Sequence, residues 1–321
     1  MRKIVTVTGE ISPEELGSCQ FHEHLLIREG RSREINDALF MDSWETSAEE
    51  AELLRKAGGD SLIDAQPGGC GRMAEGLARI SRRTGLSIIC STGFHKMIFY
   101  PEDHWIFRES RERIADFFVR ELTEGVDNHC DHEISGETAE QKAGIIKCAL
   151  DVENLTPQYK KLFEAAAEAA QRTDRILLIH IEPGSDPLQL LDFLQREGMP
   201  ADRQVYCHLD RAVSDSGVHR KILETGAFLE FDTIGRYKYH SDEEEIRIFK
   251  KHIGGGFGKQ LLFSLDTTRT RLSAYGPTEI GLDYIRRVFV PLMEKNGVTP
   301  EQIGDIMRGN PLRALVGKEN T

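Results

Sequence analysis

The chain is poor in cysteine, and the cysteines it has are widely spaced. Only 6 of its 321 residues are cysteine, and none forms a Cys-x-x-Cys pair. We therefore expect reduced thiols and no disulfide framework. No run approaches the roughly 18 apolar residues of a membrane-spanning helix, and the apolar stretch that follows Met1 is much shorter than a signal peptide needs. These absences predict a cytoplasmic protein without a membrane segment.

The chain also lacks an excess of positive charge. It has 41 Lys and Arg residues against 53 Asp and Glu, giving a net charge of −12, and no basic run covers a helix face. A nucleic-acid partner is therefore not expected, and a small-molecule substrate is the better expectation. No linker, low-complexity segment or short repeat divides the sequence. We predict a single domain over residues 1–321, because α/β barrels of about 250 residues or more routinely form one domain.

Short apolar runs alternate with longer segments of helical period. Such alternation is typical of repeated βα units and a parallel sheet. The runs are apolar almost throughout, as strands covered on both faces are. The predicted strands are Cys19–His24, Ser61–Ala65, Ser87–Thr92, Gly144–Ala149, Ile176–His180, Gln204–His208, Ala227–Phe231 and Leu261–Leu265. Eight such strands predict an α/β fold of the (β/α)8 TIM-barrel class.

Capping residues and prolines mark several helices between these strands. Thr156-Pro157 opens a helix at Gln158–Gln171, and Asp186-Pro187 opens one at Leu188–Arg196. We also expect a capping box at Ser47 and Glu50, and an amphipathic helix at Thr278–Lys295 after Pro277. A short N-terminal hairpin that begins with Lys3–Thr8 should close the bottom of the barrel, and Glu124–Gln141 should be irregular.

Residues that can ligate a metal stand at the downstream ends of several predicted strands. A (β/α)8 barrel gathers the C-terminal ends of its strands at one rim, where barrel enzymes keep their active sites. Residues far apart in sequence would therefore meet there. The set is His22, His24, Lys147, His180, His208 and Asp266.

Each member of this set has a structural alternative. His22 and His24 are two residues apart on a strand, so their side chains share one face and could grip one ion. Taken alone they could equally be packed rim residues. His180 or His208 alone could be a hydrogen-bonded structural histidine. Asp266 follows a mostly apolar run, where a carboxylate is costly unless it is paired or bound to a cation; it could also cap a helix.

Lys147 lies inside an apolar run, where an unpaired ammonium would be costly. An ammonium cannot ligate a metal. The neutral amine, which burial favours, is a nucleophile that can add CO2 to give a carbamate, whose two oxygens can bridge two cations. The alternative is an ordinary buried lysine paired with a carboxylate. Six such residues on five strand ends together predict a metal centre.

Motifs along nearly the whole chain resemble the phosphotriesterase-like branch of the amidohydrolase superfamily. The resemblance implies two divalent ions, with zinc, manganese or cobalt all suited to the ligands, and a homodimer. It places one ion on His22, His24 and Asp266, the second on His180 and His208, and carbamylated Lys147 with a hydroxide between them. The motifs are Phe21-His-Glu-His-Leu25, Gly71-Arg72, Thr84-Gly85-Leu86, Ala143-Gly-Ile-Ile-Lys147, His208-Leu-Asp210, Phe231-Asp-Thr-Ile-Gly235 and Asn310-Pro311.

The implied mechanism has the bridging hydroxide attack a carbonyl or phosphoryl group. Asp266 would be the catalytic residue that accepts the hydroxide proton and passes it to the leaving oxygen. Asp210 is a candidate partner for a metal-ligating histidine, or else an exposed loop charge.

The loops after the last two strands carry basic residues in an otherwise acidic chain. Barrel enzymes often hold a phosphate with these two loops. The candidate substrate-binding residues are Lys96, Lys238, Arg269 and Tyr275; the alternative is that these are solvated loop residues. The loops resemble those of the subgroup acting on phosphorylated sugar lactones. The tyrosine that acyl-homoserine lactonases commonly carry near Lys96 is His95 here.

We therefore expect hydrolysis of a small, phosphorylated sugar lactone. The alternatives are an unphosphorylated or acyl lactone, an organophosphate triester, and a metal-binding scaffold without turnover. The complete ligand set and Asp266 argue against the scaffold, which needs no proton shuttle.

Overall fold

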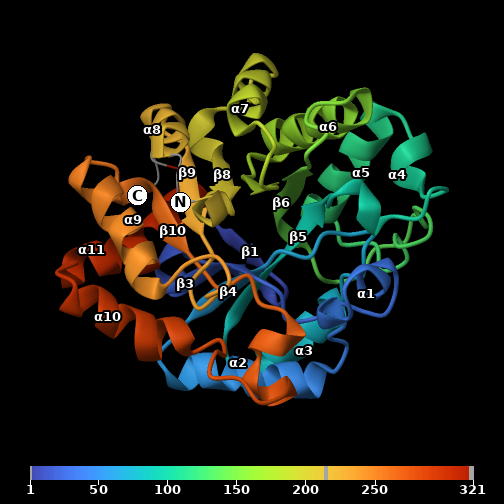
Figure 1. Cartoon of the computed structure of the whole chain (residues 1–321). Coiled ribbons are helices and arrows are strands. Elements are labelled where there is room, and N and C mark those ends of the chain that lie inside the picture. The colour runs from blue at the N-terminus through green and yellow to red at the C-terminus, as the bar shows by residue number, and fades with distance from the viewer. Residues whose placement is uncertain (1, 213–215, 318–321) are drawn as a thin grey trace.

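Eight parallel strands form the centre of the molecule (Figure 1). The computed structural model describes residues 2–212 and 216–317. The strands pair in the order β10-β9-β8-β7-β6-β5-β4-β3, and the Asp266 amide closes the ring by donating to the His22 carbonyl at 3.1 Å. The strands are β3 Cys19–Glu23, β4 Ser61–Asp64, β5 Ser87–Gly93, β6 Ala143–Leu150, β7 Leu177–Ile181, β8 Gln204–Cys207, β9 Phe228–Phe231 and β10 Leu261–Phe263. All eight strands and the predicted barrel fold are confirmed.

Helices surround the strands as an outer layer (Figure 1). Among the described residues, none of these helices is long and apolar enough to cross a membrane. The α-helices are α1 Arg31–Ile35, α2 Trp44–Lys56, α3 Ala74–Thr84, α4 Trp105–Arg108, α5 Arg111–Thr123, α6 Pro157–Thr173, α7 Pro187–Arg196, α8 Ser216–Glu224, α9 Asp242–Gly254, α10 Val290–Lys295, α11 Pro300–Gly304 and α12 Asn310–Val316. Helices α6 and α7 begin as predicted, with Thr156 and Asp186 as their N-caps.

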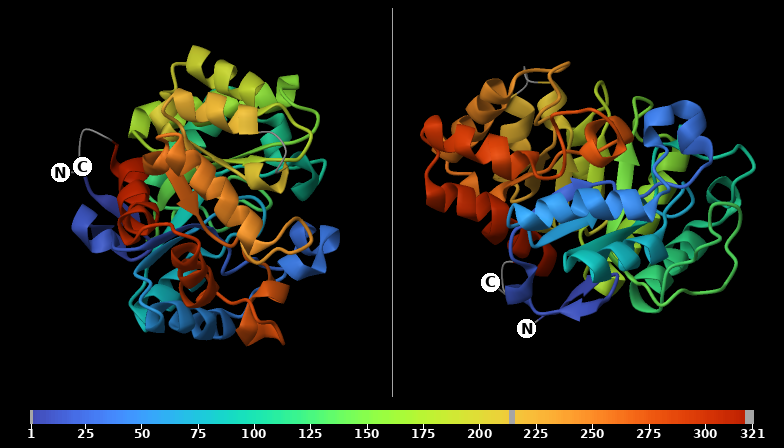
Figure 2. Two further views of the ribbon diagram at one scale, coloured as in Figure 1. Left: turned by 60° about the vertical axis from the view of Figure 1, so that its left-hand side comes forward. Right: turned by 90° about the horizontal axis from the view of Figure 1, so that it is seen from below.

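An N-terminal hairpin closes the end of the barrel away from the strands' C-terminal rim (Figure 2). Its strands, β1 Ile4–Thr6 and β2 Gly9–Ile11, pair antiparallel, which confirms the predicted hairpin. Ile4 packs in one buried cluster with barrel-interior residues such as Ile145. Gly144 lies so close to the hairpin that a Cβ there would be 2.5 Å from the Val5 carbonyl oxygen. Glycine at this position therefore permits the hairpin to dock.

The predicted capping box at Ser47 is wrong. Helix α2 begins earlier, at Trp44, and its N-cap is Ser43, whose side chain accepts from the Thr46 amide. Ser47 lies inside the helix and is buried; its hydroxyl donates to the Leu25 carbonyl at 2.6 Å. The prediction failed because a serine followed three residues later by glutamate looks the same in the sequence whether the serine caps the helix or, as here, lies inside it and bonds to a rim loop.

The helix predicted at Thr278–Lys295 begins later than expected. A π-helical turn at Ile285–Phe289 leads into α10. The residues before it are tied to buried Glu50, which accepts from the Leu282 amide at 2.7 Å, and Gly281 has a φ of +128°. The Glu50 contact and this backbone geometry hold the segment in a loop, so Pro277 does not open a helix.

The segment predicted to be irregular at Glu124–Gln141 contains no helix or strand among its described residues. A buried ion pair at its start fixes it to the barrel. Arg72 donates to Glu121 at 2.8 Å and to the Asp127 carbonyl at 3.2 Å. Glu121 also accepts from the Asp127 amide at 2.9 Å. Both side chains are almost fully buried, so neither charge has water as an alternative partner.

We predict that Glu121→Ala lowers the free energy of unfolding by about 3–5 kcal/mol, because it leaves Arg72 buried without its counter-charge. Urea denaturation measures this change. The control is Glu224→Ala, which breaks the exposed Arg220–Glu224 pair and should cost about 1 kcal/mol or less. Equal losses in the two variants would show that the buried pair does not hold the segment.

Candidate metal centre

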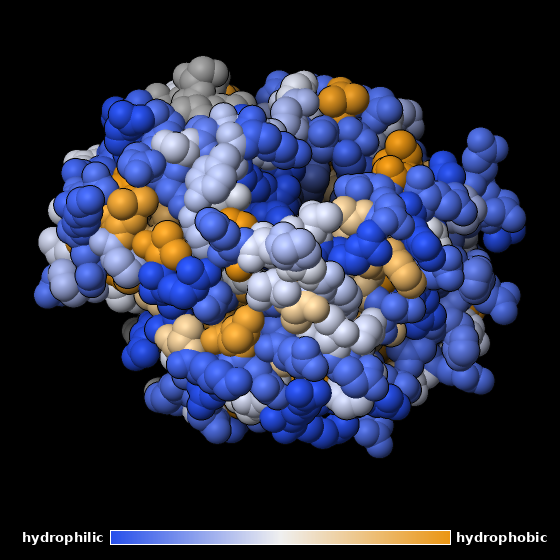
Figure 3. Space-filling model, turned by 60° about the horizontal axis from the view of Figure 1, so that its bottom comes forward, coloured by the Kyte–Doolittle hydropathy of each residue, from blue (hydrophilic) through white to orange (hydrophobic). Residues whose placement is uncertain are grey.

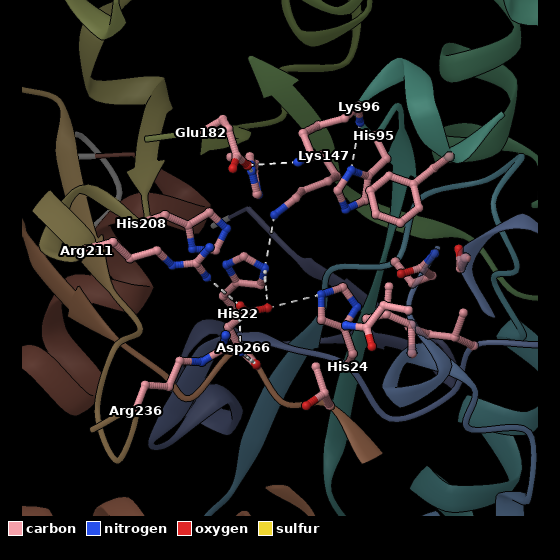
Figure 4. A pocket seen from close by; sticks show the side chains of 18 of the residues that line it. His22, His24, His95, Lys96, Lys147, Glu182, His208, Arg211, Arg236 and Asp266 are labelled. Carbon is pink, nitrogen blue, oxygen red and sulfur yellow. Dashed lines mark hydrogen bonds and ion pairs between the residues drawn. The ribbon is translucent and has the colours of Figure 1, made fainter. Parts of the chain in front are cut away.

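The six predicted ligand residues line one cavity at the C-terminal rim of the barrel. The cavity has a volume of about 250 Å³, and its mouth is the hollow toward the top of the hydrophilic face in Figure 3. Figure 4 shows labelled members of the set converging on a common centre. The residues are His22 on β3, His24 just after it, Lys147 on β6, His180 on β7, His208 after β8 and Asp266 after β10.

The alternation of strand β6 places Lys147 inside the barrel. Ile145 belongs to the barrel-interior cluster, whereas Ile146 packs outward among the helices. Lys147, two residues after Ile145, therefore points inward. Its side chain is 1 % exposed, and its Nζ lies 3.0 Å from His22 Nε2. The amine is thus inside the cavity, next to a candidate ligand.

His22, His24 and Asp266 have the spacing of ligands around one ion. Asp266 Oδ1 lies 3.6 Å from His22 Nε2 and 3.5 Å from His24 Nε2. Ligands of a tetrahedral zinc ion with bonds near 2.0–2.1 Å stand roughly 3.3 Å apart. The three residues each offer one ligand atom, and these atoms lie within 4.8 Å of one another. The donor set therefore fits a divalent cation.

The rings of His180 and His208 pack edge to face, with their centroids 4.2 Å apart. Each ring has one nitrogen against a carboxylate. His208 Nδ1 lies 2.5 Å from Asp232 Oδ2, and His180 Nε2 lies 2.9 Å from Glu182 Oε2. A carboxylate on one ring nitrogen orients a histidine and leaves the other nitrogen for a metal.

Burial keeps these imidazoles neutral, as metal ligation requires. It lowers the pKa of His180 to about 4. It also lowers the pKa of His208 well below its ordinary value, with further lowering from Arg211. The pKa of His22 is held well below its ordinary value by burial and then by Lys147. The lone pairs of all three rings are therefore available at neutral pH.

Asp232 is a site residue that the sequence reasoning missed. It directly follows the apolar strand β9, which is the same signal that singled out Asp266. Asp210, predicted as a histidine partner, instead accepts from the backbone amides of Asp232 at 2.8 Å and Thr233 at 2.6 Å. It is fully buried rather than an exposed loop charge. Asp210 thus fixes the turn that presents Asp232 to His208.

Cys207 and Asp232 form a second candidate cation group with His22 and His208. Burial raises the pKa of the Cys207 thiol well above its ordinary value, so the thiolate that a metal needs is disfavoured. Asp232 lies on the Nδ1 side of both His22 and His208. This group therefore suits orientation of the two rings better than ligation.

Two arginines that the sequence reasoning did not single out hold the outer oxygen of Asp266. Arg211 and Arg236 contact Asp266 Oδ2 at 2.6 and 2.8 Å, and Figure 4 shows both side chains reaching it. Burial alone would raise the pKa of Asp266, but Arg236 and the neighbouring histidines hold it well below its ordinary value. The backbone of Asp266 is also unusual, with a φ of +48°, as strained residues at functional sites can be.

The structure places two of the four candidate substrate-binding residues in the cavity wall. Lys96 and Lys238 line the cavity. Arg269 and Tyr275 do not belong to the lining, because other partners take their polar groups. Arg269 pairs with Asp37, and the Tyr275 hydroxyl donates to the Ser43 carbonyl at 3.0 Å. The basic residues that the cavity has in their place are Arg211 and Arg236.

A (β/α)8 barrel with histidines, a lysine and an aspartate converging at its C-terminal rim is typical of hydrolases that use metal-activated water. The chain belongs to the phosphotriesterase family, whose model matches residues 2–315. The predicted resemblance and the hydrolase class are thereby confirmed.

Individual relatives cover nearly the whole chain. A phospho-furanose lactonase of Mycoplasmopsis synoviae is 30% identical over 98% of this chain and 92% of its own length. An N-acetyltaurine hydrolase of Danio rerio is 26% identical over 98% of each chain. The crystal structure of a lactonase from Listeria monocytogenes superimposes with a TM-score of 0.89 at 27% identity, covering 99% of this chain and 100% of the other.

We predict that protein reconstituted with zinc and bicarbonate binds close to two ions per chain, and that Lys147→Met loses most of this metal. The reason is that the predicted carbamate ligand needs a side-chain amine, which methionine lacks. Metal analysis by mass spectrometry measures the ratio, and circular dichroism checks that the variant is folded. The control is Lys160→Met on the outer helix α6. A folded Lys147→Met protein with two ions would contradict the bridging role.

Proposed function

We propose that the chain is a binuclear metal-dependent lactonase whose substrate is a small sugar lactone carrying a phosphate. The observation that carries this proposal is the charge of the cavity wall. Beside Lys147 and the histidines, the cavity is lined by four basic residues and two acidic ones; these are Lys96, Arg211, Arg236, Lys238, Glu182 and Asp266. This positive excess stands in a chain of net charge −12, and it favours an anionic substrate.

Lys238 is the best candidate for the phosphate contact. Lys96 is paired with Glu182, and both arginines are paired with Asp266. Among the described residues no ion pair involves Lys238; its Nζ lies 4.7 Å from the centre of the Tyr239 ring. An ammonium held at a cavity wall without a counter-charge suits a phosphate, since hydrogen bonds between ionised partners are the stronger kind.

The six ligand residues would hold two divalent cations. When bound, these cations activate water as a nucleophile near neutral pH and polarise the substrate carbonyl. Lys147 would contribute as a carbamate, formed when its neutral amine adds CO2 and loses a proton. This anion offsets part of the cationic charge, and the barrel interior around it excludes bulk water.

Asp266 is proposed to move the proton. Its Oδ1 faces His22 and His24, while the two arginines fix Oδ2. The carboxylate would accept a proton from the attacking water and give it to the oxygen that leaves the carbonyl carbon as the lactone ring opens. The positive charges that lower the pKa of Asp266 would favour the second transfer, in which the proton passes to the alkoxide.

The alternatives fit this cavity less well. An acyl lactone or a neutral organophosphate triester would leave Lys238 without a partner. A metal-binding scaffold would have no use for an aspartate held between two arginines. The zebrafish relative indicates amide hydrolysis as a second candidate, because N-acetyltaurine carries an anionic sulfonate that the same cations could hold. A substrate panel of lactones with and without phosphate, together with N-acetyltaurine, separates these functions.

We expect Asp266→Asn to lower kcat by on the order of 10²–10⁴-fold, the usual contribution of a general acid and base. Asparagine keeps an oxygen toward the histidines but cannot carry the proton. Steady-state rates at matched metal content give the comparison. A variant that retains its two ions and turns over at the wild-type rate would assign the proton transfer to another group.

Lys238→Met should raise KM for a phosphorylated lactone by on the order of 10-fold or more and leave kcat nearly unchanged. A charge-assisted hydrogen bond made equally in the bound substrate and the transition state affects binding alone. The same variant should process the unphosphorylated lactone with unaltered KM. Lys160→Met serves as the matched control, and an equal KM increase for both lactones would reject Lys238 as the phosphate contact.

A further inference from the structure

A lysine and a glutamate form an ion pair in the cavity wall, on the side away from Arg236 (Figure 4). Lys96 Nζ donates to Glu182 Oε2 at 2.9 Å. The same oxygen contacts His180 Nε2 at 2.9 Å. Lys96 follows strand β5 and Glu182 follows β7, so the pair bridges two rim loops across the end of β6, the strand that carries Lys147.

The pair still has hydrogen-bonding capacity that faces the cavity. No hydrogen bond from the described residues reaches Glu182 Oε1, whereas Oε2 has two partners. The Glu182 side chain is 28% exposed and the Lys96 side chain 19%, and both residues line the cavity. An ammonium has three donors, of which the Glu182 contact uses one. A free carboxylate acceptor and free ammonium donors therefore stand side by side.

This wall is unsuited to a phosphate. The Glu182 carboxylate balances the charge of Lys96 and would repel an anion brought close to it. A neutral group that both donates and accepts hydrogen bonds meets no such repulsion. A hydroxyl is such a group, since its hydrogen can bond to the carboxylate while its oxygen accepts from the ammonium. Lys238, which has no ion pair among the described residues, belongs to a different rim loop, the one after β9.

We propose that Glu182 and Lys96 recognise the ring hydroxyls of the substrate beside the scissile carbonyl and so determine specificity for polyhydroxylated lactones. This proposal rests on the proposed lactonase function. It specifies that the pair binds the lactone ring rather than the phosphate. The contact between Glu182 and His180 places the hydroxyl subsite next to the candidate metal centre. The phosphate and the hydroxyls would thus be held by different rim loops.

A purely structural role makes a different prediction. If Glu182 only oriented His180, its loss would impair every substrate equally.

The test therefore compares the wild type and Glu182→Gln on two lactones that differ only in their ring hydroxyls. Glu182→Gln should lower kcat/KM for the hydroxylated lactone by about 10-fold, because a charge-assisted bond becomes a neutral one. Any loss that comes from the His180 contact is shared by both lactones, so the ratio of kcat/KM for the hydroxylated lactone to kcat/KM for the lactone without ring hydroxyls should fall by about 10-fold. Glu153→Gln, on the exposed loop after β6, is the matched control, and metal content is measured for each protein.

A binding measurement separates this proposal from the lactonase proposal. Isothermal titration of zinc-loaded protein uses a cyclic ether polyol that has the ring hydroxyls but no carbonyl, together with its counterpart without hydroxyls. Wild-type protein should bind the polyol more tightly than the counterpart, and Glu182→Gln and Lys96→Met should reduce that preference.

Hydroxyl-selective binding that depends on Glu182, without turnover of any lactone, would reject the proposed reaction and retain the hydroxyl site. Equal losses on both lactones, or wild-type protein indifferent to hydroxyls in binding and in turnover, would overturn the hydroxyl site itself.

Discussion

The site depends on the closure of the barrel. The hydrogen bond that joins the two ends of the sheet runs from the Asp266 amide to the His22 carbonyl, so the backbones of two candidate ligands are themselves the closing contact. Glu23 strengthens the joint by accepting from the Leu265 amide at 2.8 Å. The distance between a histidine near the beginning of the chain and an aspartate near its end is therefore fixed by the barrel. A cation would meet ligands that are already in place, and little ordering would oppose its binding.

The second constraint is electrostatic, because the residues around the histidines are charged and buried. Glu230 lies under His22, 3.4 Å from its Nδ1, and is fully buried. Burial raises the pKa of Glu230 and of Asp210 well above their ordinary values. The ionised forms of these two carboxyl groups are thus less favoured than those of exposed carboxyl groups. Lys96 pairs with Glu182, and Arg211 and Arg236 pair with Asp266, each across different rim loops. These ion pairs hold the rim loops together and also set the charge around the cavity.

The sequence predicted most of the fold, and the meeting of the six candidate ligands in one cavity, for one physical reason. Parallel strands buried on both faces are apolar, so a histidine, lysine or aspartate at the end of such a run is conspicuous. Lys147 and His180 could be found in this way. Arg211 and Arg236 could not, because they lie in polar loops where one basic residue resembles another. The loop between Tyr275 and Tyr284 was misjudged because its shape depends on Glu50, more than 200 positions earlier in the sequence.

The N-terminal hairpin covers the end of the barrel opposite the cavity mouth (Figure 2). Ile4 of the hairpin and Leu16 beyond it pack in one buried cluster with barrel-interior residues, so side chains of the described residues fill this end of the barrel. Whatever enters past the rim loops must leave by the same mouth. For the proposed reaction the departing molecule keeps its phosphate and gains a carboxylate, so it is more anionic than the substrate while the walls around it remain basic. Release of the product, rather than ring opening, would then be the rate-limiting step of the proposed reaction. Accumulated hydroxy acid would compete with the lactone for the cavity and so inhibit the enzyme.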